Sequence, residues 1–73
     1  MKEHDRVVLA VDLPDQKLTA GDLGTVVHLY RDGVAYEVEF VALDGETVAI
    51  VTLTREQVRP IARREIAHAR QVA

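Results

Sequence analysis

The sequence contains no cysteine, serine, asparagine or tryptophan. Without cysteine the chain can form neither disulfide bonds nor a structural zinc site built on thiolates, which are two common supports of small domains. Its 73 residues correspond to a single domain, close to the lower size at which a hydrophobic core alone maintains a fold. Small domains of this kind often gain stability from a partner subunit, so we expect a homo-oligomer, with a dimer favoured.

The sequence also lacks an apolar run long enough to cross a membrane. Its first residues, from Lys2 to Arg6, are polar or charged throughout, whereas a signal peptide would place an apolar stretch soon after its first charges. These two features predict a cytoplasmic protein that makes no contact with a membrane.

Charge is distributed unevenly along the chain. Residues 1–54 contain ten acidic and four basic side chains, a net charge of −6, whereas residues 55–73 contain five arginines and two glutamates, a net charge of +3. Proteins that bind nucleic acid in general present a basic stripe on the folded body. An acidic body with a basic tail therefore argues against nucleic acid as a partner.

Apolar residues and turn signals predict five short strands. Asp32-Gly33 and Asp44-Gly45 provide the left-handed positions of two hairpin turns. The segment from Pro14 to Gly24 is too long for a tight hairpin, and we interpret it as a loop anchored by Leu18. A single helical turn starting at Thr54 precedes the last strand. The predicted strands are Arg6–Leu13, Thr25–Tyr30, Ala35–Phe40, Glu46–Leu53 and Val58–Ile61.

The fourth predicted strand, Glu46–Leu53, is apolar on both faces. A strand with one face in water should alternate apolar and polar residues, so something must cover the second face. Cross-strand alternation predicts a core that contains Val7, Leu9, Tyr36, Val38, Phe40, Val48 and Ile50. The surplus apolar positions are then Ala49, Val51 and Leu53, with Val8 and Ala10 on the first strand.

The last residues change to a helical period. Ala62, Ile66, Ala69 and Ala73 are spaced as one face of a helix, and alanine and arginine favour helices. We therefore predict a barrel domain over residues 1–61 and a helical tail over residues 62–73. Because an isolated helix of about 12 residues is marginal in water, this tail must dock, either on its own domain or on a neighbouring subunit.

Five short strands with a long first loop and a helical turn before the last strand fit a mostly β fold, a small SH3-like (KOW-like) barrel followed by a C-terminal helix. Several short motifs point further: DLP at Asp12–Pro14, GDLGTVV at Gly21–Val27 and YEVEF at Tyr36–Phe40. With Tyr30, Gly45, TL at Thr52–Leu53 and RP at Arg59–Pro60, they resemble the bacterial family of domain of unknown function 4926 over roughly residues 5–60.

That resemblance assigns no activity and no catalytic residue. It implies small single-domain proteins, some encoded beside another small protein in an arrangement like a toxin–antitoxin pair. The GDLGTVV turn is also similar, more loosely, to the KOW element of ribosomal and transcription-factor domains. The resemblance thus leaves two classes of function open, protein binding and RNA binding.

The residues offer little for catalysis. There is no serine or cysteine nucleophile, and Glu37 and Glu39 are expected on the solvent face of a strand, where two free carboxylates are ordinary. His4, His28 and His68 lack the spacing of metal ligands. We predict that the protein is not an enzyme and holds no cofactor and no metal ion.

The sequence therefore predicts a non-enzymatic module for protein–protein interaction, the antitoxin-like or immunity-like partner of another small protein. The alternative is a KOW-like module bound to RNA or the ribosome, supported by the glycine turn and the basic tail. Tyr30 could present its ring to a peptide or pack at the rim of the barrel. The candidate binding residues are Tyr30, Arg31, Ala49, Val51, Leu53 and Ile66.

Overall fold

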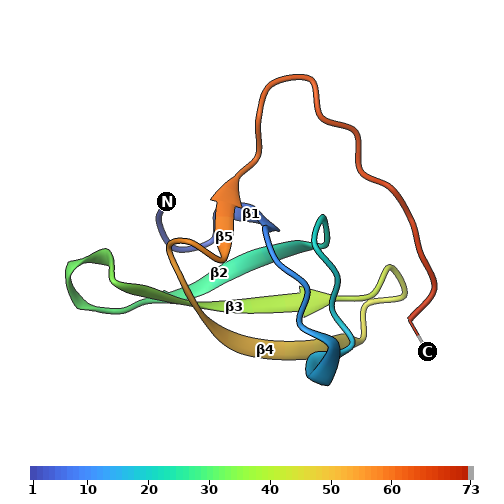
Figure 1. The fold of residues 1–73 in the computed structure, drawn as a ribbon, viewed down its shortest axis with the longest axis horizontal. Helices are drawn as coiled ribbons and strands as arrows, with labels where there is room; N and C mark the ends of the chain where they lie inside the picture. The colour runs from blue at the N-terminus through green and yellow to red at the C-terminus, as the bar shows by residue number, and fades with distance from the viewer. Residues whose placement is uncertain (73) are drawn as a thin grey trace.

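A computed structural model describes residues 1–72, which form an all-β fold in one open antiparallel sheet (Figure 1). Side by side in the sheet, the strands lie in the order β4-β3-β2-β1-β5. The prediction of five strands is therefore confirmed. Two 3₁₀ turns, η1 (Pro14–Gln16) and η2 (Arg31–Gly33), interrupt the connections. The strands are β1 (Arg6–Leu9), β2 (Leu23–Leu29), β3 (Ala35–Val41), β4 (Thr47–Thr54) and β5 (Val58–Pro60).

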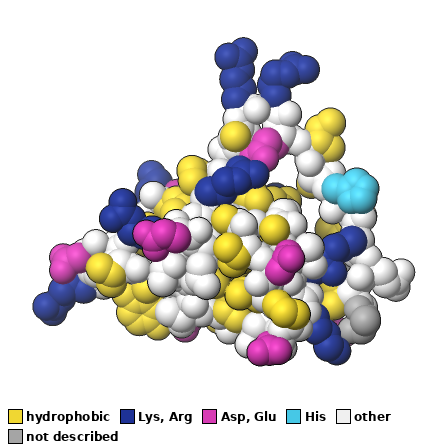
Figure 2. Space-filling view, viewed as in Figure 1, with side chains coloured by type: hydrophobic (Ala, Val, Ile, Leu, Met, Phe, Trp, Pro, Cys, Tyr) yellow, Lys and Arg dark blue, Asp and Glu magenta, His cyan; other side chains and the backbone are white. Residues whose placement is uncertain are grey.

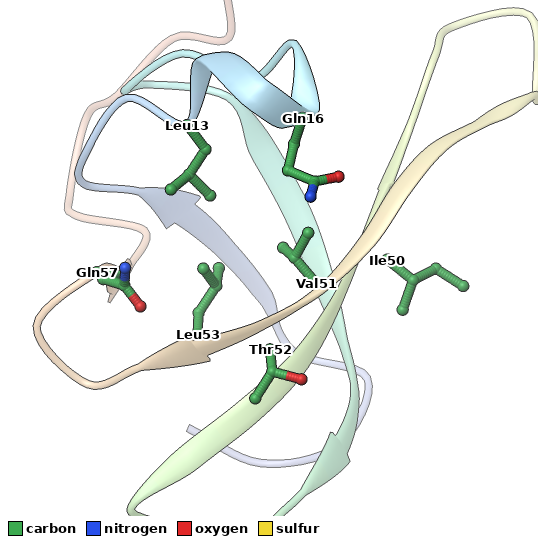
Figure 3. Close-up of a pocket in the computed structure, with 7 residues that line it drawn as sticks. All are labelled: Leu13, Gln16, Ile50, Val51, Thr52, Leu53 and Gln57. Carbon is green, nitrogen blue, oxygen red and sulfur yellow. The ribbon is translucent and has the colours of Figure 1, made fainter.

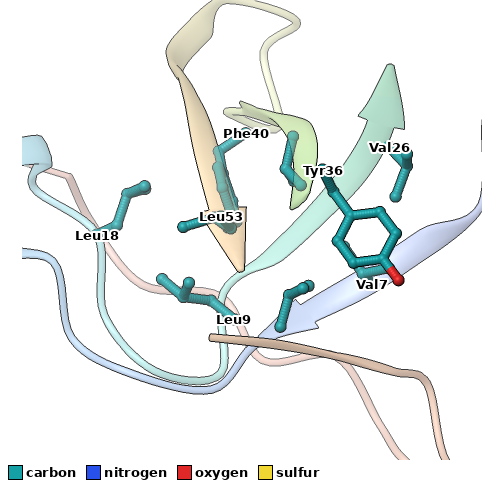
Figure 4. Packing of buried hydrophobic residues seen from close by; sticks show 9 residues of the cluster. Val7, Leu9, Leu18, Val26, Tyr36, Phe40 and Leu53 are labelled. Carbon is teal, nitrogen blue, oxygen red and sulfur yellow. The ribbon is translucent and has the colours of Figure 1, made fainter. Parts of the chain in front are cut away.

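The core lies on one face of this sheet and draws on every strand (Figure 4). Leu18 closes it from the loop between β1 and β2, as the sequence predicted, because the backbone of Leu13 pairs with that of Leu18. Burying one large aliphatic or aromatic side chain contributes about 1.5–3 kcal/mol, so this cluster is the main source of stability. Its buried members are Val7, Leu9, Leu18, Val26, Tyr36, Val38, Phe40, Leu53 and Val58.

The C-terminal helix predicted for residues 62–73 is wrong. Residues 61–72 contain no helix, and the side chain of Ile66 is 93% exposed instead of docked. Ala73, the last position of the predicted helical face, lies outside the described residues. A helix this short has little stability of its own, and two ion pairs made by Arg59 and Arg70 hold the segment in an irregular course instead. In Figure 1 the tail rises from β5 in a wide arch.

The predicted SH3-like barrel is not confirmed as a closed barrel. Across residues 1–72 no backbone pairing joins β4 to β5, so the sheet stays open and has two edges. The turn predicted as helical before β5 is a single hydrogen-bonded turn in which Gln57 N–H donates to the carbonyl of Thr54 at 3.0 Å. β5 is three residues long and β4 is eight, which leaves the two edges very different in length.

Val48 packs against the core as predicted, but from Ala49 onward the faces of β4 are the reverse of the prediction. Ile50, predicted in the core, is 55% exposed, whereas Leu53, predicted as surplus, is 1% exposed. The cause is a β-bulge: the register passes from Val41↔Thr47 to Phe40↔Ala49, which leaves Val48 as an extra residue on β4. One extra residue moves every later side chain of the strand to the opposite face.

Gly24 on β2 allows the core side chains of β3 to pack closely against the backbone of β2. A Cβ atom at this position would lie 2.6 Å from Cγ1 of Val38 and 2.9 Å from Cε1 of Phe40. The sequence suggested a left-handed turn at Gly21 and Gly24, and only Gly21 has this conformation, with φ of 98°. Gly24 is required because core side chains of β3 cross directly over its Cα.

Candidate functional site

β4 is an edge strand, and its chemistry is unusual for an edge. It pairs with β3 along its whole length and has no strand on its other side. Its sequence, TVAIVTLT, contains no charged residue and no proline. Soluble proteins normally protect an exposed edge with lysine, proline, a bulge or a very short strand. Here the bulge at Val48 lies near the hairpin, so the run from Ala49 to Leu53 remains regular and open.

The direction of the backbone groups along β4 follows from its partner strand. Tyr30 N–H donates to the carbonyl of Ala35 at 3.0 Å, so the backbone groups of Ala35 point toward β2. In an antiparallel strand these groups alternate between the two sides. Tyr36, Val38 and Phe40 therefore point toward β4, where they oppose Leu53, Val51 and Ala49.

The backbone groups of the alternate residues of β4 consequently point away from β3. The N–H and C=O groups of Ile50 and Thr52 face the free edge, because the groups of their neighbours are used by β3. Outside the strand pairings, only one backbone hydrogen bond within residues 1–72 reaches β4, the one from Gln57 to Thr54. Two residues thus present four backbone groups to a partner strand.

Thr54 confirms this alternation and ends the open edge. Its N–H donates to Oε1 of Gln57 at 2.9 Å, and its carbonyl accepts from Gln57 N–H. Both groups of Thr54 therefore point away from β3, as those of Ile50 and Thr52 do. The side chain of Gln57 caps the edge at this position, so a further strand could pair only before Thr54.

A shallow groove of about 350 Å³ adjoins the edge on the core side (Figure 3). Val51 and Leu53 provide its apolar floor, and Leu13 and Gln16 reach over it from the loop that contains η1. Figure 3 shows that Ile50 points away from these residues, on the other side of the β4 ribbon. A strand added along β4 would therefore place alternate side chains in this groove and beside Ile50.

The outer face of β2, β3 and β4 carries a row of polar contacts. The Thr52 hydroxyl donates to Glu37 Oε1 at 2.5 Å, and the Thr47 hydroxyl donates to Glu39 Oε2 at 2.6 Å. Tyr30 donates its hydroxyl to Glu37 Oε2 at 3.5 Å, and its ring meets that of His28 edge to face. Across the described residues no group of three histidines or acidic residues could hold a metal ion.

A bidentate ion pair ties the tail to the body. Arg70 donates from Nε to Asp22 Oδ1 at 2.8 Å and from Nη2 to Asp22 Oδ2 at 2.5 Å. Its Nη2 also donates to the carbonyl of Lys17 at 3.0 Å. The hydrogen bonds from Arg70 hold the pKa of the Asp22 carboxyl below its usual 3.8. A cavity of about 390 Å³ lies beneath this contact, between the tail and the loop around Leu18.

A second ion pair shapes the start of the tail. Arg59 donates from Nη1 and Nη2 to the two carboxylate oxygens of Glu65, at 2.9 Å and 2.6 Å. The backbone N–H of Ala62 also donates to Oε1 of Glu65. The guanidinium of Arg59 and then this N–H lower the pKa of Glu65 from 4.5 to about 2. Arg59 of β5 and Arg70 of the tail are thus engaged with carboxylates, and Figure 2 shows basic side chains projecting at the top of the arch.

The predicted binding residues do not form one site. Ala49 and Val51 are half-buried on the core side of β4, and Leu53 is part of the core. Tyr30 and Arg31 lie at the end of β2 and in η2, and Ile66 lies on the exposed tail. The residues that sequence reasoning missed are Ile50, Thr52, Leu13 and Gln16. The alternation of β3 could have placed Ile50 and Thr52 on the outer face of β4. The bulge in β4 changes the register between the two strands, so this could not be read from the sequence.

The comparisons with known proteins give a family and no activity. A family model described as a domain of unknown function (DUF4926) matches residues 3–60. No curated protein matches the chain, and no solved structure matches it. Within residues 1–72, no helix has the length and apolar character needed to cross a membrane.

Proposed function

The chain belongs to the DUF4926 family, and we propose that it is a non-enzymatic module that binds another protein through the free edge of β4. The observation that carries this proposal is the open, uncharged edge from Ala49 to Leu53, with the backbone groups of Ile50 and Thr52 directed outward. Edges of this kind bind extended segments by strand addition, in which the backbone provides affinity and side-chain pockets provide specificity.

The groove beside the edge supports this mode of binding. Val51 and Leu53 form an apolar floor, while the amide groups of Gln16 and Gln57 at its rim can exchange hydrogen bonds with a bound chain. An added strand would direct every second side chain into this groove. The partner segment should therefore be extended, with an apolar side chain at the position facing Val51.

The wider biological role that we propose is that of an antitoxin-like or immunity-like partner of another small bacterial protein in the cytoplasm. Such a partner acts by covering a surface and needs no catalytic group. On the outer face, the carboxylates of Glu37 and Glu39 accept hydrogen bonds from the hydroxyls of Thr52 and Thr47, contacts that hold the surface of the sheet beside this edge. A large uncharged edge suits a stable contact with one protein.

RNA binding receives less support from the same geometry. Arg59 and Arg70, half of the arginines between residues 56 and 72, are paired with Glu65 and Asp22. Among the tyrosines and the phenylalanine of residues 1–72, only Tyr30 is exposed; its ring lies after the end of β2 beside that of His28, whereas single-stranded RNA would use several aromatic rings for stacking. We therefore place nucleic acid behind protein as the partner.

The test compares variants of the tagged protein recovered from its native cells, with and without nuclease. Ile50→Lys places a charge on the open edge, as natural proteins do to block one. Val34→Lys is the matched control, since Val34 is 61% exposed and lies outside β4. We expect Ile50→Lys to lose a bound protein that wild type and Val34→Lys retain, with nuclease making no difference.

Amide hydrogen exchange in the recovered complex then locates the contact. The proposal expects the amides of Ile50 and Thr52 to gain protection on binding, because they become hydrogen-bonded to the added strand. A partner whose binding leaves both amides unprotected, or is abolished by nuclease, would contradict the proposed function. The second of these results would favour the RNA alternative.

A further inference from the structure

We infer that the β4 edge also pairs with the β4 edge of a second copy of this chain, about a two-fold axis at Val51. This inference rests on the proposed function, since it names a partner for the same edge. The two sheets would join into one continuous antiparallel sheet with both cores on the same side. Closed two-fold pairing of this kind is the commonest form of homo-oligomer.

The register follows from the positions of the free backbone groups. Only Ile50 and Thr52 direct both their N–H and C=O groups outward between the bulge and the capped Thr54. With the axis at Val51, Ile50 of each copy lies opposite Thr52 of the other copy, and all four groups of each chain find partners. An axis at Ile50 would leave Thr52 opposite the bulge at Val48, and an axis at Thr52 would leave Ile50 opposite the capped Thr54.

The side chains are compatible with the same register. The axis at Val51 sets Val51 against its own copy and Ala49 against Leu53 of the other copy, all on the core side of the joined sheet. This contact extends the apolar floor of the groove across the axis, where Gln16 reaches toward Val51. On the outer face, Ile50 meets the methyl group of Thr52. Pairs of this type are the units that stabilise neighbouring strands.

Charges do not oppose the pairing. β4 itself is uncharged, so two identical strands meet without the repulsion that a lysine or glutamate on the edge would cause. At each end of the paired strands, Arg55 of one copy lies opposite Thr47 of the other, next to Glu46. Glu56 lies one residue further on, in the turn that leaves the sheet. Opposite charges therefore flank the contact on both sides of the axis.

Because the chain contains no cysteine, a single engineered cysteine reports the register directly. Val51→Cys would face its own copy in a pair without hydrogen bonds, where the Cα atoms are about 4.5 Å apart and a disulfide can form. We expect mild oxidation to yield a covalent dimer at least about ten times faster than for the exposed control Val34→Cys. Ile50→Cys, displaced along the strand from its copy, should behave like the control.

Sedimentation of the unmodified protein provides the second readout. We expect a monomer–dimer equilibrium between about 5 and about 500 µM, shifted to monomer by Ile50→Lys and unchanged by Val34→Lys. A wild-type monomer throughout this range, with Val51→Cys no faster than Val34→Cys, would overturn the inference. Preferential cross-linking of Ile50→Cys would overturn the register and thereby the inference as stated.

The result also separates this inference from the proposed function. If wild type is monomeric but a different protein protects the amides of Ile50 and Thr52, the second copy is excluded and the edge remains a binding site. If the dimer forms and no other protein is retained by the edge, the inference stands and the proposed partner protein does not. If no dimer forms and no other protein binds the edge, both the inference and the proposed function are contradicted.

Discussion

The two edges of this sheet differ in almost every property that governs strand pairing. β5 has three residues, and two of them are Arg59 and Pro60, a charge and a residue without an N–H donor. β4 has eight residues with neither a charge nor a proline. Both edges belong to one small domain in the same solvent, so a general need for solubility does not account for the difference.

The difference leaves one edge protected and the other open, and the open edge is the one that we propose for binding. Proline at an edge blocks pairing, and an edge charge is costly to bury against another strand. Arg59 is further engaged by Glu65, which fixes the tail beside β5. At β4 the alternation leaves Ile50 and Thr52 as donors and acceptors, with an apolar groove beside them.

The largest difference in thermal stability should be seen between two single proline variants at neighbouring positions of β4. Val51→Pro removes the N–H that β3 uses at Val38, and the buried acceptor that loses its donor costs about 1–3 kcal/mol before any steric strain is added. We expect no cooperative thermal transition for this variant. Ile50→Pro removes only a donor at the free edge and should melt cooperatively. Similar melting curves for the two variants would contradict the assigned alternation.

The second-largest difference should be in the free energy of unfolding, between alanine substitutions on the two faces of β4. Leu53→Ala removes a side chain that is 1% exposed and should cost about 2–5 kcal/mol in the free energy of unfolding. Ile50→Ala, at a position 55% exposed, should change it by less than about 0.5 kcal/mol. Urea denaturation measures both values. A larger loss for Ile50→Ala would restore the opposite assignment of faces.

Removing the protection of β5 should have a smaller effect on assembly. The double variant Arg59→Val and Pro60→Thr gives this edge an apolar side chain and the missing donor. We expect species larger than those of wild type only near the highest concentrations, because three residues offer few backbone groups. Sedimentation identical to wild type at all concentrations would show that the length of β5, and not its chemistry, keeps this edge closed.

The smallest expected effect is the loss of the ion pair between Arg70 of the tail and Asp22 at low pH. Because the pKa of Asp22 is lowered by Arg70, this pair stabilises the folded tail above the usual value of 3.8 and is lost as pH falls through the lower folded value. An NMR titration should find a lowered Asp22 pKa in wild type and a higher Asp22 pKa in Arg70→Gln, because the hydrogen bonds from Arg70 are the main cause of the lowering. Equal values in the two proteins would mean that the tail does not hold Asp22 in solution.

The sequence allowed the strands to be predicted, but not which face of β4 lies inside. Alternation in Ala35–Phe40 correctly placed Tyr36, Val38 and Phe40 in the core, because glutamates mark the other face. β4 carries apolar residues on both faces, so its orientation depends on the register with β3, and the bulge at Val48 shifts that register by one.

The helical tail was predicted wrongly, and the candidate binding residues lie apart in the structure, for related reasons. The spacing of Ala62, Ile66 and Ala69 satisfies a helical period, but propensity over so few residues is outweighed by the contacts of Arg59 and Arg70. The candidate site depended on the supposed surplus face, which placed Leu53 at the surface. Of the candidate residues, Ala49 and Val51 lie on the edge strand β4, and their role in binding stays a prediction.

The central claim is that β4 is an unpaired edge whose outward backbone groups belong to Ile50 and Thr52. Residue-resolved amide exchange on dilute protein tests it most directly. The expected result is slow exchange for Ala49, Val51 and Leu53 and fast exchange for Ile50 and Thr52, with protection of these two appearing only as protein concentration or a bound partner increases. Uniform protection along β4 in the dilute protein, or fast exchange at Val51, would contradict the account.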